Sequence, residues 1–138
     1  TVCLFKNINF TTMKAEIKFV KTKDFIKTTA SGQLSLEQSK KVLKEIARLN
    51  TTDDLHDLLV DIRDTLPGLS LSDIYELVTE VGNHRQAFRK KIAILLGSQH
   101  DIDKARFLEM CASNRGYNVN VFDDFEEAVN WLMCEDEE

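Results

Sequence analysis

Three charged residues in the middle of the chain could bind an ion or transfer a proton: Asp61, Arg63 and Asp64. They lie at the end of the run from Leu58 to Ile62, in which every residue except Asp61 is apolar. A run without polar–apolar alternation is typical of a central strand in a mostly parallel sheet. Ligands of open α/β sheets bind beyond the carboxyl ends of the strands, so we expect a turn and a site from Arg63 onward. The structural alternative is that Arg63 forms an ion pair with one of the two acids.

Hydroxyl groups follow in the next segment. Thr65, Ser70 and Ser72 could accept a phosphoryl group, and Tyr75 lies on the less apolar side of a helix expected from Ser72 to Val81. A phosphate there would meet free backbone amides and the positive end of the helix dipole. The structural alternative makes these hydroxyls ordinary turn and cap residues. The candidate binding surface is Asp61, Arg63, Asp64, Thr65, Ser70, Ser72 and Tyr75, with Ser70 and Ser72 as candidate phosphorylation sites.

Other residue types form no reactive pattern. The three histidines fall in different segments and lack the spacing of a helical metal pair, which predicts surface or loop positions. The three cysteines are widely separated, which favours neither a disulfide framework nor a zinc site and fits a reducing compartment. These residues are His56, His84 and His100, and Cys3, Cys111 and Cys134. We expect no metal, no cofactor and no catalytic residue.

The composition excludes several classes of protein. With 138 residues, 43% hydrophobic and 30% charged, the chain has the size and make-up of one globular domain. A formal net charge of -5 provides no basic face, so we expect no nucleic-acid binding. No apolar run approaches the ~20 residues of a membrane span, and no signal-peptide pattern is present. We therefore expect no membrane span and a cytoplasmic location.

Strands and helices are expected to alternate around the site. Residues 15–20 and 24–30 predict a β-hairpin that ends at Ser31-Gly32, and the capping-box spacing of Ser35 and Gln38 predicts a helix start. Gly82-Asn83 either ends its helix in a left-handed cap or leads into a further helical piece at 84–88. The remaining strands are expected at 58–62, 92–96 and 119–122, and the remaining helices at 72–81, from Asp101 or Asp103 to 114, and at 125–132.

The predicted order is β-β-α-β-α-β-α-β-α. It implies an α/β fold with an N-terminal hairpin and a mostly parallel central sheet joined by right-handed crossovers. We divide the chain into an N-terminal extension at 1–12, a single domain at 13–134 and a solvated acidic tail at 135–138. The extension is expected either to be disordered or to add an edge strand.

The order of these elements and five short segments resemble the small bacterial STAS-like proteins. These proteins are related to the sporulation anti-sigma-factor antagonists and are sometimes grouped with CRAL-TRIO lipid-binding domains. The resemblance covers residues 13–134, and its specificity comes from the ordered set of segments. The segments are Gly32-Gln33-Leu34-Ser35, Leu59-Val60-Asp61-Ile62-Arg63, Lys91-Ile92-Ala93-Ile94-Leu95, Val121-Phe122-Asp123 and Glu127-Ala128-Val129-Asn130-Trp131-Leu132.

This resemblance implies a binding or regulatory domain, typically controlled by phosphorylation of a serine in the loop after the central strand. The sequence departs from that pattern here. The antagonist loop reads Asp-Ser-Ser-Gly-Leu, and the segment aligned with it is Thr65-Leu66-Pro67-Gly68-Leu69. Leu66 and Pro67 replace the serines and cannot accept a phosphoryl group, so the anti-sigma switch is not expected in this form.

A second resemblance concerns the receivers of response regulators, whose phosphoacceptor region is similar to Asp61 followed by Ile62-Arg63 and Pro67-Gly68. Receivers also need paired acids after an earlier strand and a lysine after the last one. The predicted early strands end in Lys21-Thr22-Lys23 and Ala30-Ser31-Gly32, and the last ends in Phe122-Asp123-Asp124. The receiver function is therefore not expected.

Three functions stay open from the sequence. The first is a non-catalytic regulator that binds a protein partner. The second is a carrier or sensor of a small apolar or anionic ligand, held beside the helix after the central strand. The third is an enzyme that uses Asp61, Arg63 and Asp64. The sequence does not decide whether the domain forms a homodimer.

Overall fold

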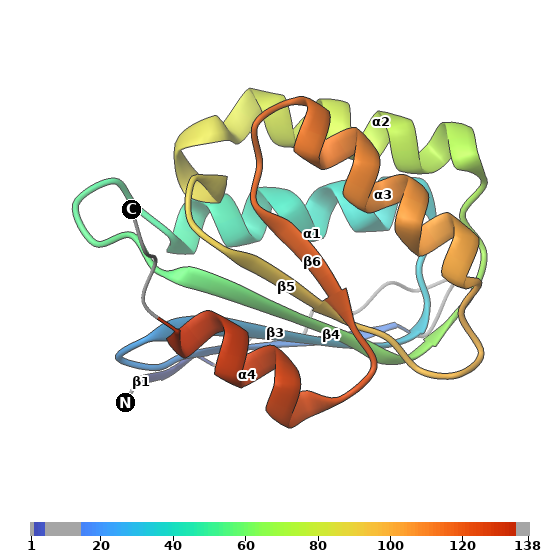
Figure 1. Ribbon diagram of the computed structural model, residues 1–138. Coiled ribbons are helices and arrows are strands. Elements are labelled where there is room, and N and C mark those ends of the chain that lie inside the picture. The colour runs from blue at the N-terminus through green and yellow to red at the C-terminus, as the bar shows by residue number, and fades with distance from the viewer. Residues whose placement is uncertain (1, 5–14, 135–138) are drawn as a thin grey trace.

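One six-stranded sheet forms the centre of the molecule (Figure 1). The computed structural model describes residues 2–4 and 15–134. The strands are β1 (Val2–Leu4), β2 (Glu16–Lys21), β3 (Phe25–Gln33), β4 (Asp57–Leu66), β5 (Ile92–Leu95) and β6 (Val119–Phe122), in the spatial order β1-β2-β3-β4-β5-β6. The first three strands pair antiparallel, and β3 to β6 pair parallel. This arrangement confirms the predicted hairpin and parallel sheet.

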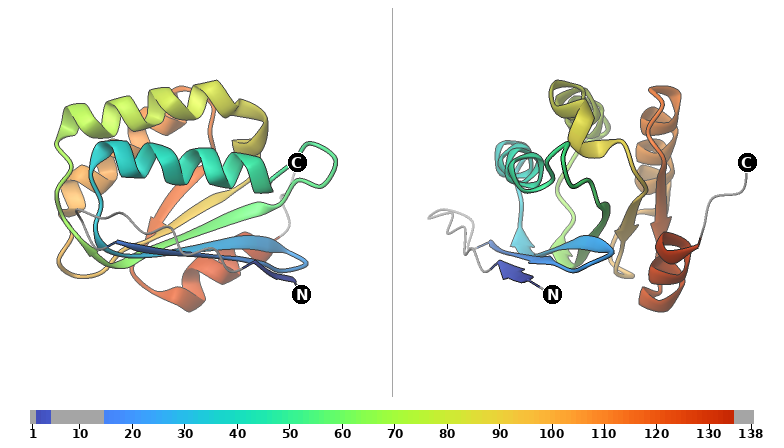
Figure 2. Two further views of the ribbon diagram at one scale, coloured as in Figure 1. Left: turned by 180° about the vertical axis from the view of Figure 1, so that it is seen from behind. Right: turned by 90° about the vertical axis from the view of Figure 1, so that its left-hand side faces the viewer.

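The helices are α1 (Leu36–Leu49), α2 (Leu71–Val81), the 3-10 helix η1 (Gly82–Phe88), α3 (Ile102–Asn114) and α4 (Phe125–Met133). Strands that follow chain order place right-handed crossovers on one side of a sheet. Accordingly, α1, α2 and α3 cover one face, while α4 folds back over the other (Figure 2). The sheet therefore has two faces with different coverings.

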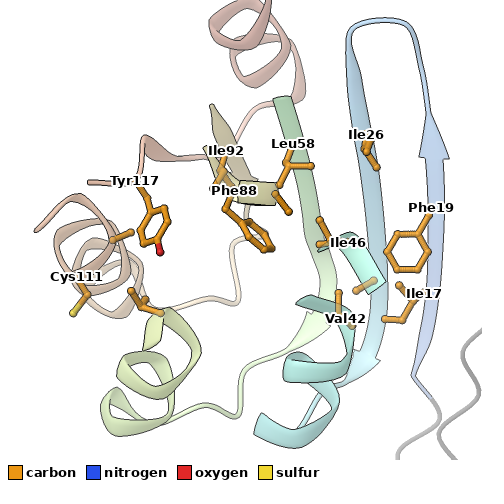
Figure 3. Close-up of a cluster of buried hydrophobic side chains, with 14 of the residues drawn as sticks. Ile17, Phe19, Ile26, Val42, Ile46, Leu58, Phe88, Ile92, Cys111 and Tyr117 are labelled. Carbon is orange, nitrogen blue, oxygen red and sulfur yellow. The ribbon is translucent and has the colours of Figure 1, made fainter. Parts of the chain in front are cut away.

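Strand β4 contributes to the core on both faces of the sheet. Leu58 packs beneath α1 to α3, and its neighbour Leu59 packs against α4. Their exposed fractions are 1% and 0%, as expected for a strand covered on both sides. Figure 3 shows the larger cluster, in which Ile46 and Phe88 lie between the sheet and its helices. This burial confirms that the 58–62 run is a central strand.

The predicted helix starts are confirmed in detail. Ser35 accepts a hydrogen bond from the Gln38 backbone while the Gln38 side chain accepts from the Ser35 backbone, which completes a capping box. Asp101 and Asp124 cap α3 and α4 in the same position. Short polar residues before apolar stripes were therefore sufficient to locate these helices.

One predicted boundary is wrong, and two alternatives left open by the sequence are decided. β3 does not end at Ser31-Gly32 but continues through Gly32, at φ +87°, to Gln33. Gly82 has φ -61° rather than a left-handed value, so the chain continues into η1, the second helical piece considered above. Residues 2–4 of the predicted extension form edge strand β1 on β2. The rest of that extension and the tail at 135–138 lie outside the described residues.

A buried asparagine joins three segments at the amino edge of the sheet. The Asn50 side-chain nitrogen donates to the carbonyl oxygens of His56 (3.1 Å) and Ala87 (2.7 Å), and its oxygen accepts from the His56 backbone nitrogen (2.8 Å). His56 and Ala87 are buried as well as Asn50, so water cannot replace the side chain as the partner of their backbone groups. The contact ties the end of α1 to the chain entering β4 and to η1.

Replacing Asn50 with alanine is expected to lower the free energy of unfolding by about 3 kcal/mol, because it leaves three buried backbone groups without partners. The matched control is Asn114→Ala, at an exposed position in the last turn of α3, which should change the stability by less than about 0.5 kcal/mol. Chemical denaturation of both variants measures the difference. Equal stability of the two variants would contradict the role of Asn50.

Candidate functional site

The candidate site begins where β4 extends past its neighbour β5. The register with β3 advances from Thr29–Asp61 to Ser31–Asp64, so β4 carries one extra residue there, a β-bulge. Beyond the bulge β4 continues to Leu66, whereas β5 ends at Leu95 opposite Asp61. The expected turn from Arg63 onward is therefore wrong. Polar residues 63–65 resemble a loop in sequence, but β3 extends alongside and pairs with them.

Two side chains from the loop between β5 and α3 replace the missing strand along this part of β4. The Gln99 side-chain nitrogen donates to the carbonyl oxygens of Arg63 (2.5 Å) and Thr65 (2.8 Å). His100 Nε2 lies 3.0 Å from the carbonyl oxygen of Ile62 and 3.1 Å from Thr65 Oγ1. These contacts satisfy carbonyl groups that β5 would pair in a longer strand. Sequence reasoning missed both residues.

Gly97 permits this close approach. A Cβ atom at residue 97 would lie 2.7 Å from the Arg63 carbonyl oxygen and 2.3 Å from the side-chain oxygen of Gln99. Both distances are too short for a carbon–oxygen contact, so a larger residue at position 97 would displace Gln99 from β4. The predicted strand at 92–96 ends just before Gly97. The position of Gly97 in the structure lets the following loop pack directly on β4.

Asp61 and Arg63 form an ion pair on the α4 side of the sheet. Arg63 donates from Nε (3.0 Å) and its backbone nitrogen (3.1 Å) to Asp61 Oδ1, and from Nη2 to Oδ2 (2.8 Å). Burial raises the pKa of Asp61, but these hydrogen bonds and the charges of Arg63 and Lys27 outweigh it, so the pKa lies below its usual range. The side chains of Arg63 and Lys27 also lie over the ring of Phe125, in α4.

The remaining acid and the first hydroxyl of the predicted surface have different surroundings. Asp64 is exposed, and its charge helps to raise the pKa of Arg63, after the larger effect of the hydrogen bond to Asp61. Thr65 is buried, and its hydroxyl donates to the Ile62 carbonyl oxygen at 2.8 Å. Thr65 is therefore a strand residue with an occupied hydroxyl and not a turn residue accessible to a kinase.

Ser70 and Ser72 lie at the exposed start of α2. Ser70 forms a capping box with Asp73: Ser70 Oγ accepts from the Asp73 backbone (3.1 Å), and Asp73 Oδ2 accepts from the Ser70 backbone (3.0 Å). Ser72 Oγ is 3.1 Å from Ser70 Oγ. Tyr75, one turn further on, has the Arg115 guanidinium over its ring at 4.6 Å. The predicted cap at Ser70 is thus confirmed.

Four exposed apolar or aromatic side chains lie at the end of β4 and in the first turns of α2 and α3, and we call them the carboxyl-edge patch. Its members are Leu66, Leu71, Tyr75 and Ile102, with exposed fractions of 57%, 49%, 52% and 55%. Leu71 and Tyr75 share one side of α2 at the i, i+4 spacing. The Lys104 ammonium donates to the carbonyl oxygen of Leu69 (2.8 Å) and so holds the start of α3 against the loop before α2. Except for Tyr75, sequence reasoning missed this patch.

The residues predicted to form one surface divide into two groups. Arg63, paired with Asp61, lies over Phe125 of α4, whereas Ser72 and Tyr75 lie in α2 and Ser70 caps it. These two helices cover opposite faces of the sheet (Figure 2). His56, expected at the surface or in a loop, lies in a loop but is buried. Within residues 2–4 and 15–134, no three His, Cys, Asp or Glu side chains converge as a metal site would require. Over the same residues, no helix has the length and apolar character needed to cross a bilayer.

Replacing Arg63 with methionine is expected to lower the free energy of unfolding by about 2 kcal/mol at neutral pH, because the buried carboxylate of Asp61 loses its partner. The pKa of Asp61 is lower in the folded than in the unfolded chain. The stabilisation is therefore complete above a pH of about 5 and is lost as the pH falls through the folded pKa. The difference between the two proteins should shrink in acid, as denaturant unfolding over a pH series will measure.

Arg48→Met is the matched control, because Arg48 pairs with Glu45 at the surface of α1. The Arg48 side chain is 63% exposed, and an i, i+3 helix pair with so exposed a cation contributes little, so a loss below about 0.5 kcal/mol is expected at every pH. If Arg63→Met were no more destabilising than Arg48→Met, the importance of the Asp61–Arg63 pair would be refuted.

The fold matches that of a known crystal structure. An uncharacterized protein of the DUF3478 family from Shewanella loihica PV-4, described as having a SpoIIAA-like fold, superposes with a TM-score of 0.59 at 19% sequence identity. The match covers 92% of this chain and 99% of that one. No protein-family model matches the sequence, and no curated protein matches it. The chain therefore has the SpoIIAA-like, or STAS-like, α/β fold that its sequence resembles.

Proposed function

We propose that this domain is a non-catalytic binding module that docks a protein partner on the carboxyl-edge patch. The observation that carries the proposal is that four apolar or aromatic side chains are exposed where β4 ends and where α2 and α3 begin, at the carboxyl ends of the parallel strands. Contiguous exposed apolar groups on a folded domain mark interaction sites, and the central part of a protein interface is enriched in such residues. The SpoIIAA-like fold is consistent with a regulatory or binding role.

The patch is held on a rigid support, which favours recognition of a defined partner. Leu66 is the last residue of β4, and Leu71 is the first residue of a capped helix. The hydrogen bonds of Gln99 and Lys104 fix the loop that precedes Ile102 against the chain that carries Leu66 and Leu71. A preformed surface loses less conformational entropy when it binds, so a small patch can give useful affinity.

The environment of the charged residues argues against catalysis. The Asp61 carboxylate and the Arg63 guanidinium hydrogen-bond to each other, and the lowered pKa of Asp61 keeps it ionised at neutral pH. A general acid or base needs a pKa near the working pH, so Asp61 is poorly suited to proton transfer. The pair supports a structural role on the α4 side rather than an active site.

Ser70 and Ser72 stay the proposed phosphoacceptors of the patch, and Ser72 is the better suited of the two. Phosphorylation of Ser70 would place a second negative charge beside Asp73 and break the capping box. Ser72 lies in the first turn of α2, where a phosphate would meet the positive end of the helix dipole. Phosphorylation of either serine would add negative charge next to Leu71 and weaken the apolar contact between the patch and its partner.

Replacing both Leu71 and Ile102 with serine is expected to weaken capture of the partner by about tenfold or more, because each side chain loses apolar area that binding would bury. The tagged chain serves as bait in extract from the source organism, and mass spectrometry quantifies the proteins retained. The matched control is the double variant Met110→Ser and Met133→Ser, which alters two side chains of similar exposure outside the patch.

The proposal requires a partner that binds the native chain and the control but not the patch variant. A partner retained equally by all three proteins would refute the patch as the docking surface. Native mass spectrometry of the chain from the same source tests the ligand alternative. A copurifying small molecule, without any protein partner, would favour a carrier or sensor instead.

A further inference from the structure

β6 is an edge strand of the parallel sheet and pairs on one side with β5 (Figure 1). The carbonyl oxygens of Asn118 and Phe122 accept from Ile92 and Leu96, so the even-numbered residues direct their backbone groups toward the sheet. Alternation along the strand then turns the backbone groups of Val119 and Val121 outward. An outward row of this kind is a template on which another strand can pair.

A carboxylate occupies one of these outward groups. The Val121 backbone nitrogen donates to Glu109 Oε2 at 2.7 Å, and Glu109 belongs to α3, which lies beside β6. Arg106 Nη1 donates to the other carboxylate oxygen at 2.9 Å, which fixes the orientation of the group. The Glu109 side chain is 18% exposed, so its contact with the strand is largely screened from water.

A side-chain amide occupies a second outward group. The neighbours of Asn120 assign its orientation: the side-chain oxygen accepts from Trp131 Nε1 and the nitrogen donates to the carbonyl oxygen of Val119, both at 3.2 Å. Thus an acceptor sits on the outward N–H of Val121 and a donor sits on the outward C=O of Val119. Glu109 and Asn120 thus occupy two of the four outward backbone groups of Val119 and Val121.

We propose that Glu109 blocks edge-to-edge pairing of two copies of this chain through β6. A second copy fits the edge because a two-fold axis at Asn120 would pair Val121 N–H of each copy with the Val119 carbonyl of the other. β6 itself, Val119–Phe122, contains neither a charged residue nor proline, the usual protections of an edge strand. The protecting charge is supplied by α3 instead. This inference is independent of the carboxyl-edge patch.

Two copies cannot pair while the carboxylates remain in place. The Glu109 oxygen occupies the position where the Val119 carbonyl oxygen of the second copy would accept. Removing the carboxylate leaves the Val121 N–H without an acceptor. The Val119 carbonyl oxygen has two lone pairs, so it can accept from the second copy while the Asn120 amide stays in place.

The test is sedimentation velocity of the full chain carrying Glu109→Ala, measured over a wide range of concentrations beside the native chain. We expect the variant to reach twice the mass of the native chain as its concentration rises. The double variant Glu109→Ala with Val121→Pro should sediment as the native chain does, because proline removes the outward N–H that the pairing needs. If Glu109→Ala fails to fold, as judged by circular dichroism, Glu109→Met keeps the length of the side chain and replaces it.

Hydrogen exchange gives a second readout that does not depend on association. In dilute samples, the Val121 amide should exchange about tenfold or more faster in Glu109→Ala than in the native chain, since its acceptor is gone. A variant that sediments like the native chain at every concentration would overturn the proposal. Association that persists with Val121→Pro would overturn it as well, because the contact would then lie elsewhere.

Discussion

The difference in length between β4 and β5 is the constraint on which the candidate site depends. β5 ends opposite Asp61, but β4 continues to Leu66 with only β3 beside it. Backbone carbonyl groups along the uncovered side need donors, and the loop after β5 supplies them through Gln99 and His100. This requirement pulls the start of α3 toward β4 and places Ile102 at the same edge of the sheet as Leu66.

The same extension separates two groups of residues on opposite faces of the sheet. On the α4 side, Asp61 and Arg63 neutralise each other and secure the strand against Phe125. On the opposite side, the helices capped by Ser70 and Asp101 carry residues of the apolar patch. The proposed interaction surface, built from a strand end and two capped helices, needs no flexible loop. The binding role proposed here thus follows from how the sheet is extended and not from a reactive group.

Local signals in the sequence were sufficient for the fold, but long-range contacts decided the site. Capping residues such as Ser35 and the doubly buried run at Leu58 located helices and the central strand. The extension of β4 was missed because Arg63 and Asp64 break the apolar run, and only pairing with β3 keeps them in the strand. The bulge in β4 and the hydrogen bond from Gln99 to Thr65, 34 residues away, produce no periodic pattern in the sequence, so neither could be predicted.

The roles of charged residues were the hardest to predict from the sequence, because their partners are far away along the chain. Lys91 follows Arg89 and Lys90 in what looks like a solvated basic run, yet it is buried and donates to the carbonyl oxygen of Trp131 at the end of α4. Glu109 likewise resembles an ordinary surface residue of α3 in the sequence, but in the structure it accepts a hydrogen bond from the Val121 backbone in β6. In both cases a charge satisfies backbone groups of another element, which spacing within one helix or strand cannot indicate.

Amide hydrogen exchange at Asp64 and Leu66, the residues of the extension whose backbone groups face β3, tests the central claim most directly. If β3 holds the extension in the sheet, both amides should exchange nearly as slowly as those at the centre of β4, and clearly faster when Gln99 is replaced by alanine. Exchange in the native chain as fast as at Gly68, in the following loop, would contradict the extension of β4. The segment after Asp61 would then be a loop, and the patch would lose its rigid support.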